Sequence, residues 1–273
     1  MLTTLLTLAL LATPLQRAAE FNGSVPGLFT IAQLDSMLAG EQAADTAQRV
    51  GDWAQRMAAA GDDGYCFGLA DGGYVAEGRL APGRRFDCIS FVYRTTELAR
   101  AHHARHALVV ALDTRFAGAP RDSVVDDRGE VDYDRPEHLD YSVDMIRSGH
   151  WGRDVTAGLA GAAPDAQGSS RYAAGAVVTA PETTLDPDEL HHGDVIWFVL
   201  SSDDATAARL RHEYGLMIGH AGVVVRQDGE VWLVHAASQP LPGWYESGGV
   251  VRVPLEIYLQ RVERYSAVMV TRF

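Results

Sequence analysis

The sequence predicts an α+β domain in which an amphipathic helix packs on a central antiparallel sheet. Three observations predict this class. A helical pattern of apolar residues begins at Cys88, directly after Asp87. The two-residue turn Asp228-Gly229 separates two apolar runs, which is the pattern of a β-hairpin. A third apolar run, residues 195–200, has the length of a buried strand.

The predicted helices lie in the first half of the chain. Apolar residues recur at helical spacing in residues 45–60, which predicts an amphipathic helix there. Its inward positions are Val50, Trp53, Met57 and Ala60. The helix from Cys88 has its own inner side, formed by Val92, Thr95, Leu98 and Ala99. Residues 108–116 predict a further helix, and residues 124–134 an acidic hairpin.

Two long insertions are expected between the predicted core elements. Residues 157–189 are rich in Ala, Gly, Ser, Pro and Asp and contain one predicted strand, at residues 176–179. Residues 201–219 form a polar segment before the hairpin. Such segments usually run over the surface, although long loops also line active sites. Asp194, between these insertions, is interpreted as a turn residue.

The hairpin register follows from its turn. If Gln227 pairs with Glu230, His235 faces Gly222 and His220 lies on the same face, as a diagonal neighbour roughly 7–8 Å away between backbones. Gly222 leaves space for the His235 ring. The opposite face is apolar, and we expect it to be covered by other elements. Its residues are Ala221, Val223, Val225, Trp232 and Val234.

One thiol and two imidazoles are suited to nucleophilic catalysis. A cysteine has an ordinary pKa of about 8.5, and only its thiolate attacks carbonyls well. Asp87 is a good N-cap, which places Cys88 in the first helical turn, where the positive end of the helix dipole favours an anion. A protonated His220 would favour the thiolate further, and His235 would orient the His220 ring.

The order of these motifs resembles the NlpC-type cysteine peptidases and amidases of bacterial cell walls, within the papain-like superfamily. The resemblance runs from about Thr46 to Arg272. It implies that Cys88 is the nucleophile, His220 the base and His235 the polar third member. It also implies a papain-like core with long loop insertions. Tyr65 falls where the family has a tyrosine that holds the substrate.

The match is closest to the N-acetylmuramoyl-L-alanine amidase-like branch. The common Asp-Cys-Ser-Gly-Phe pattern is absent, because Ile89 and Ser90 follow the cysteine. The branch pattern, Asp-Cys-x-Thr/Ser-x-Val, fits better, and residues 144–156 and 215–220 also resemble it. Tyr93 replaces the glutamate that this branch has after the nucleophile. We assign Asp87 and Ser90, together with Tyr65, as candidate substrate-binding residues.

The resemblance implies a hydrolase that cleaves an amide bond in peptidoglycan stem peptides or in the N-acetylmuramoyl-L-alanine linkage. This reaction requires no metal and no cofactor. Three alternatives stay open at this point. Cys88, His220 and His235 could instead be ligands of a zinc-binding hydrolase. The chain could be a catalytically degenerate wall-binding module, or a thiol acyltransferase.

Composition and charge restrict the partners. The chain has 273 residues, 47% of them hydrophobic, which is enough for one large core, and a formal net charge of −13. Such a charge argues against nucleic acid as a partner. Residues 102, 103 and 106 are histidines, for which a solvated surface is expected rather than a metal site. Cys66, the other cysteine, is predicted to be a buried apolar residue.

The N-terminus predicts export. Residues 2–12 form an apolar run of signal-peptide length that is too short to span a bilayer, so no integral membrane segment is expected in the mature chain. We therefore divide the chain into a signal peptide, residues 1–20, and one hydrolase domain, residues 21–273. The expected location is periplasmic or extracellular, and cytoplasmic if the segment is not a signal.

Overall fold

A computed structural model describes residues 27–67, 84–116, 118–126, 131–132, 135–139, 143–165 and 176–273. The predicted signal peptide lies outside the described residues. So does the tip of the predicted acidic hairpin, residues 127–130, although an isolated antiparallel bridge joins Val125 to Val131 on either side of it.

Six of the described α-helices precede the first strand, one lies between β4 and β5, and one between β7 and β8. The described α-helices are α2 (Ile31–Gly40), α3 (Thr46–Ala60), α5 (Cys88–Arg100), α6 (Ala104–Arg115), α7 (Arg121–Val124), α8 (Val143–Arg147), α9 (Ala205–Tyr214) and α10 (Leu255–Arg261). Two 3-10 helices are η1 (Thr156–Gly158) and η2 (Pro187–Glu189). None of the described helices has the length and apolar character needed to cross a lipid bilayer.

The strands form an antiparallel sheet. They are β1 (Arg153–Asp154), β2 (Ala163–Asp165), β3 (Val177–Pro181), β4 (Val195–Leu200), β5 (Ile218–Gln227), β6 (Glu230–Ala237), β7 (Gly249–Pro254) and β8 (Tyr265–Arg272). Within the described residues they make an eight-stranded sheet in the order β2-β3-β8-β4-β5-β6-β7, with β1 also paired to β8. The α+β class and the antiparallel sheet are thus confirmed.

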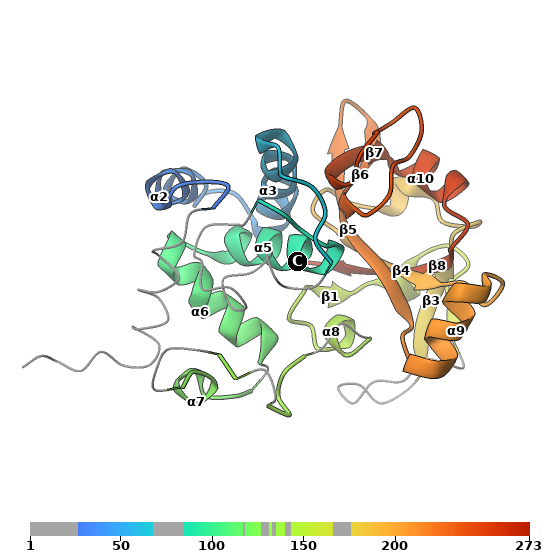
Figure 1. The fold of residues 1–273 in the computed structure, drawn as a ribbon, viewed down its shortest axis with the longest axis horizontal. Helices are drawn as coiled ribbons and strands as arrows, with labels where there is room; N and C mark the ends of the chain where they lie inside the picture. The colour runs from blue at the N-terminus through green and yellow to red at the C-terminus, as the bar shows by residue number, and fades with distance from the viewer. Residues whose placement is uncertain are drawn as a thin grey trace, which may run out of the picture.

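Each face of the sheet has its own hydrophobic core. One core joins α2, α3, α5, α6 and α8 to strand residues such as Trp197, Val223 and Val234. The second lies on the opposite face and includes Phe198 and Leu233 together with residues of α9 and α10. Figure 1 shows α2, α3, α5, α6, α7 and α8 grouped on one side of the strands, and α9 and α10 on the other.

The hairpin has the predicted register. Gln227 pairs with Glu230, and Val223 pairs with Val234. We predicted that other elements cover the apolar face of the hairpin. This is confirmed, because α3 and α5 pack against β5 and β6. A Cβ added to Gly222 would lie 3.0 Å from the His235 Cβ, so this glycine does provide room for the ring.

The other predicted elements are largely confirmed. The helix expected at residues 45–60 is α3, in which Val50, Trp53 and Met57 are buried whereas Ala60 is exposed. The helix expected at residues 108–116 starts earlier, as α6, because the His103 side chain caps it by accepting the His106 N–H. The strand expected at residues 176–179 is β3. The insertions contain two further elements that were not expected, β2 in the first and α9 in the second.

Candidate active site

A capping box begins α5 at Asp87. The Asp87 carboxylate accepts the Ser90 N–H at 2.7 Å, and the Ser90 hydroxyl accepts the Asp87 N–H at 3.0 Å. Cys88 is the first helical residue, as predicted, and is 8% exposed. Asp87 and Ser90 are also buried, so both side chains serve the helix cap in this structure. Their substrate contact stays a prediction.

The two histidines of the hairpin are in direct contact. His220 Nε2 lies 2.8 Å from His235 Nδ1, with the rings perpendicular at an interplanar angle of 89°. His220 pairs with Phe198 of β4, and the register shifts at the next pair, so that Gly219 is a β-bulge directly before His220. Such bulges often re-aim side chains beside active sites.

Aromatic rings enclose this histidine pair. Tyr258 of α10 stacks on His220 at 5.9 Å between ring centroids and meets His235 edge-on at 4.9 Å. Tyr265, the first residue of β8, stacks on His220 at 6.1 Å. On the far side of His235, the Tyr245 hydroxyl lies 3.4 Å from Nε2. No pattern in the sequence indicated these three tyrosines.

Burial favours the neutral form of both imidazoles. Loss of hydration, together with the positive charge of Arg264, lowers the pKa of His220 to about 3. Burial and the neighbouring His220 hold the pKa of His235 well below its usual value. These closed aromatic surroundings disfavour an imidazolium, so they oppose the expected protonated His220, which stays a prediction.

A negative charge on Cys88 would raise the pKa values of the tyrosines around the histidines. Burial raises the pKa values of Tyr258 and Tyr265, and the charge on Cys88 raises both further. Burial also raises the pKa of Tyr65, with Cys88 and Asp87 as the next contributors. Although α5 covers the opposite face of the sheet, its first turn thus comes close to the face that carries the imidazoles.

A short parallel bridge fixes Tyr65 beside the start of α5. Tyr65 is bridged to Phe86, and the Cys66 N–H donates to the Phe86 carbonyl at 3.0 Å. The Tyr65 Cβ also lies near Gly248, in the segment between β6 and β7. Cys66 is half-buried and is not joined to Cys88 by a disulfide, so the prediction that Cys66 is fully buried is wrong.

The described residues contain no group of three His, Cys, Asp or Glu side chains that could hold a metal ion. His220 Nε2 and His235 Nδ1 face each other at hydrogen-bond distance, so these two nitrogen atoms bind each other. The histidines near residue 102 form a local surface cluster: the rings of His102 and His106 stack at 4.9 Å, and His106 Nδ1 accepts the His102 N–H.

The fold occurs in solved structures of low sequence identity. A Legionella pneumophila protein assigned to the family DUF1460 is 16% identical, with a TM-score of 0.62 over 88% of this chain and 93% of that chain. An N-acetylmuramoyl-L-alanine amidase of Bacteroides uniformis is similar in two crystal structures. In one the identity is 17% and the TM-score 0.56, over 83% of this chain and 98% of that chain. In the other the identity is 16% and the TM-score 0.55, with the same coverage.

No protein-family model matches the chain, and no curated protein sequence is significantly similar to it. At 16–17% identity, the structural similarity establishes a shared fold. A papain-like, NlpC-type kinship and the roles of individual residues stay predictions.

Asp194 does more than mark a turn. Its buried carboxylate accepts two hydrogen bonds from Arg272, each 2.7 Å long, and a third from the His191 N–H. This ion pair ties the start of β4 to the end of β8. The sequence contained no local signal for it, because the two residues are 78 positions apart.

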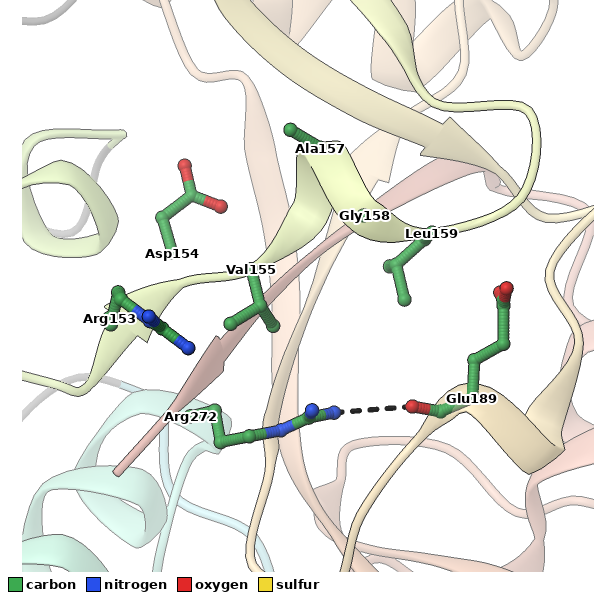
Figure 2. Close-up of a pocket in the computed structure, with 8 residues that line it drawn as sticks. All are labelled: Arg153, Asp154, Val155, Ala157, Gly158, Leu159, Glu189 and Arg272. Carbon is green, nitrogen blue, oxygen red and sulfur yellow. Dashed lines mark hydrogen bonds between the residues drawn. The ribbon is translucent and has the colours of Figure 1, made fainter.

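A cavity of about 450 Å³ lies beside this ion pair. Figure 2 shows Arg153, Val155 and Leu159 around it, with the Arg272 guanidinium reaching the Glu189 carbonyl. Arg272 ends β8, whereas the histidines lie beside its other end, next to Tyr265. The cavity is therefore separate from the candidate active site.

Proposed function

We propose that the chain is a cysteine amidase of the bacterial cell wall, which cleaves an amide bond in peptidoglycan stem peptides or the N-acetylmuramoyl-L-alanine linkage. One observation carries the proposal: a buried His220–His235 contact of 2.8 Å in an aromatic site on β5 and β6, the strands against which the helix that begins at Cys88 packs. The amidase name of the Bacteroides uniformis neighbours, whose fold the chain shares, supports this substrate class.

The position of the hydrogen between the two rings determines which nitrogen atom of His220 can act as the base. For His220 Nδ1 to accept a proton, His220 Nε2 must carry the hydrogen and donate it to His235 Nδ1. His235 then carries its own hydrogen on Nε2 and donates it to the Tyr245 hydroxyl. This tautomer leaves a lone pair on His220 Nδ1 for the thiol proton, and His235 acts as the positioning residue.

The reaction starts from a neutral thiol and a neutral imidazole. The Cys88 sulfur attacks the amide carbonyl while its proton moves to His220 Nδ1, and the Cys88 backbone N–H donates to the oxyanion. The C–N bond breaks, and His220 returns the proton to the leaving amine. Water then attacks the thioester with His220 as base, the C–S bond breaks, and the sulfur regains its proton.

Asp87 and Ser90 support this reaction through the cap that holds the first turn of α5, and Tyr65 contacts the substrate beside it. Peptidoglycan lies outside the cytoplasmic membrane. We therefore also propose that the protein is exported, with residues 1–20 as its signal peptide.

Mass spectrometry of muropeptide digests tests the proposal. The wild type should release products that gain one water at a single amide bond. Cys88→Ala should release none while keeping its thermal unfolding temperature, and Cys66→Ala should retain activity. Hydrolysis by Cys88→Ala would refute the role of the thiol. A product that gains an acceptor amine instead of water would identify acyl transfer, and digests without any product would favour a binding module.

A further inference from the structure

Two arginines lie directly opposite each other in the wall of the cavity beside the Asp194–Arg272 ion pair. Arg153 of β1 and Arg272 of β8 are partners in the antiparallel register, so their side chains leave the same face of the sheet. Both line the cavity of about 450 Å³, and Figure 2 shows the two side chains extending in the same direction from the paired strands. Like charges in this position repel each other and destabilise the strand pair.

The backbone holds β1 in this register. Gly152 has a φ of +95°, and a Cβ added to it would lie 2.9 Å from the backbone N and C atoms of Arg272. Only a glycine before Arg153 therefore lets β1 approach the end of β8 so closely. On the other side of the pair, the Val155 N–H donates to the Val270 carbonyl at 2.9 Å. Backbone contacts thus keep the two arginines together.

Only one of the two charges is compensated. The Arg272 guanidinium donates to both carboxylate oxygens of Asp194 at 2.7 Å and to the Glu189 carbonyl at 3.2 Å. Arg153 is exposed, and no carboxylate pairs with its side chain among the residues that the structure describes. The chain has 36 acidic and only 23 basic residues, so carboxylates are not scarce. Arg153 therefore offers an uncompensated positive charge to the cavity.

The two carboxylates in the cavity wall are bound by other groups. Asp154 Oδ1 accepts the Thr156 N–H at 3.0 Å, and Oδ2 lies 3.5 Å from the Arg147 guanidinium. Glu189 Oε2 accepts a backbone N–H at 3.0 Å. Both negative charges still line the cavity, so they repel a ligand with two negative charges such as phosphate. A single carboxylate is balanced by Arg153.

Aliphatic side chains complete the wall. Val155, Ala157 and Leu159 line the cavity, and Leu159 belongs to the hydrophobic core on this side of the sheet. A cavity of this size, largely preformed and with apolar walls and a few polar groups, is typical of a small-molecule site. The charge and the apolar surface together define a ligand that is anionic at one end and aliphatic at the other.

We propose that this cavity is a second binding site, for a ligand with one carboxylate and a short aliphatic group. The Arg153 guanidinium donates two parallel hydrogen bonds to the carboxylate, and the aliphatic group lies against Val155 and Leu159. A free aliphatic acid and the carboxyl end of a peptide share this chemistry. The site is separate from the candidate active site and does not depend on the proposed function.

Ligand-observed NMR titration tests the site. The probes are 4-methylpentanoate and 4-methylpentanamide, which have the same shape and differ in charge. The wild type should bind the acid about tenfold more tightly than the amide, as expected for one charge-assisted hydrogen bond. Acetate should bind about tenfold more weakly than 4-methylpentanoate, because it lacks the aliphatic group. An equal concentration of inorganic phosphate should not displace the acid.

Variants of the unpaired arginine assign the charge. Arg153→Gln should bind the acid and the amide equally, and Arg153→Lys should keep part of the preference because the charge remains. Arg105→Gln is the matched control, since Arg105 is also exposed and has no carboxylate partner among the described residues. It should keep the full preference. Thermal unfolding of each variant at the wild-type temperature confirms that lost binding is not lost folding.

Equal affinities of the wild type for the acid and the amide would overturn the proposal. The same preference in Arg153→Gln as in the wild type would also overturn it, as would an equal loss in Arg105→Gln or displacement by phosphate. A peptide arm, acetyl-alanyl-leucine with a free carboxyl end, identifies the source of the ligand. Tighter binding than 4-methylpentanoate would support a peptide end, and weaker binding would support a free acid.

Discussion

At the scale of single residues, the burial of the two histidines determines when the thiol of Cys88 loses its proton. His235 is 1% exposed and His220 8% exposed, and burial is the main cause of the lowered pKa of each. A thiolate–imidazolium pair in the resting site would require a protonated ring in these closed surroundings. We therefore expect the proton to leave the thiol only as the sulfur attacks.

Alkylation of Cys88 tests this expectation. In a Cys66→Ser variant, which lacks the other thiol, the rate of carboxamidomethylation by iodoacetamide should keep rising with pH above about pH 6, because a neutral His220 supplies no positive charge that would hold a thiolate at lower pH. Peptide mapping by mass spectrometry measures the rate at Cys88. A rate that is already constant from about pH 4 upwards would contradict the prediction, since a preformed ion pair behaves in that way.

Tyr245 is expected to act through the tautomer of His235. Burial raises the pKa of the Tyr245 hydroxyl to about 12, so this group stays protonated at working pH. Its oxygen can then accept a hydrogen bond from the His235 Nε2–H. Tyr245→Phe should lower kcat by about tenfold or less and leave KM unchanged. Trp244→Phe, on the same loop but 40% exposed, is the control. A change in KM alone would show that Tyr245 contacts substrate instead.

At the scale of elements, the β5–β6 hairpin holds the two imidazoles in register. The hairpin needs a residue without a side chain opposite His235, and Gly222 meets this need. A Cβ at Gly222 would lie 2.6 Å from Leu233 Cδ1 and 2.9 Å from the Val234 carbonyl oxygen. Neither neighbour has free space, because Leu233 and Val234 are fully buried.

Gly222→Ala should therefore displace the strands and lower the free energy of unfolding by about 1–3 kcal/mol. It should also lower activity more than stability, because the His220–His235 contact depends on this register. Urea unfolding and muropeptide hydrolysis measure the two effects. Gly40→Ala is the control, since nothing lies within 4 Å of its added Cβ, and it should unfold like the wild type. Unchanged activity in Gly222→Ala would contradict the prediction.

The cap of α5 and the register of the hairpin were both predictable because their signals are local. Asp87 and Ser90 are three residues apart, and Asp228 and Gly229 form the turn itself. Glu97 of α5 shows the limit of such signals. Its carboxylate is buried and receives two hydrogen bonds from Arg115 of α6, a pairing that no spacing in the sequence predicts.

At the scale of the whole molecule, burial of the imidazoles makes stability depend on pH. The pKa of His220 falls from 6.5 in the unfolded chain to about 3 in the fold, so the unfolded state binds more protons between these values. The stabilising contribution of the neutral ring is fully present above about pH 6.5 and is lost as the pH falls towards 3.

Wild-type protein should accordingly lose more stability than His220→Gln on acidification. Between about pH 6.5 and pH 4, the wild type should lose ~3 kcal/mol more free energy of unfolding than the variant. Urea titrations at both pH values measure the difference, in which the contributions of the shared carboxylates cancel. Equal losses in both proteins would mean that the His220 pKa is not lowered in the fold.

Glu182 has the opposite dependence. Because burial raises its pKa from 4.5 to about 7, its contribution to stability is fully present below about pH 4.5 and is lost as the pH rises through 7. Glu182→Gln should therefore be more stable than the wild type at pH 8, by about 1–2 kcal/mol after allowance for the partial exposure of the carboxyl. The two proteins should be equally stable at pH 4. Thermal unfolding at both pH values checks this, and equal unfolding temperatures at pH 8 would contradict it.

The amino-acid sequence by itself determined the helix that begins at Cys88, the hairpin with His220 and His235 on one face, and the covered apolar face behind it. These features depend on turn chemistry, capping and side-chain periodicity, which act over a few residues. Only the tertiary structure decided that the imidazoles are buried, with their pKa values lowered, and that three tyrosines enclose them. The pKa of a buried group depends on which distant segments exclude water from it, and no local pattern in the chain encodes that exclusion.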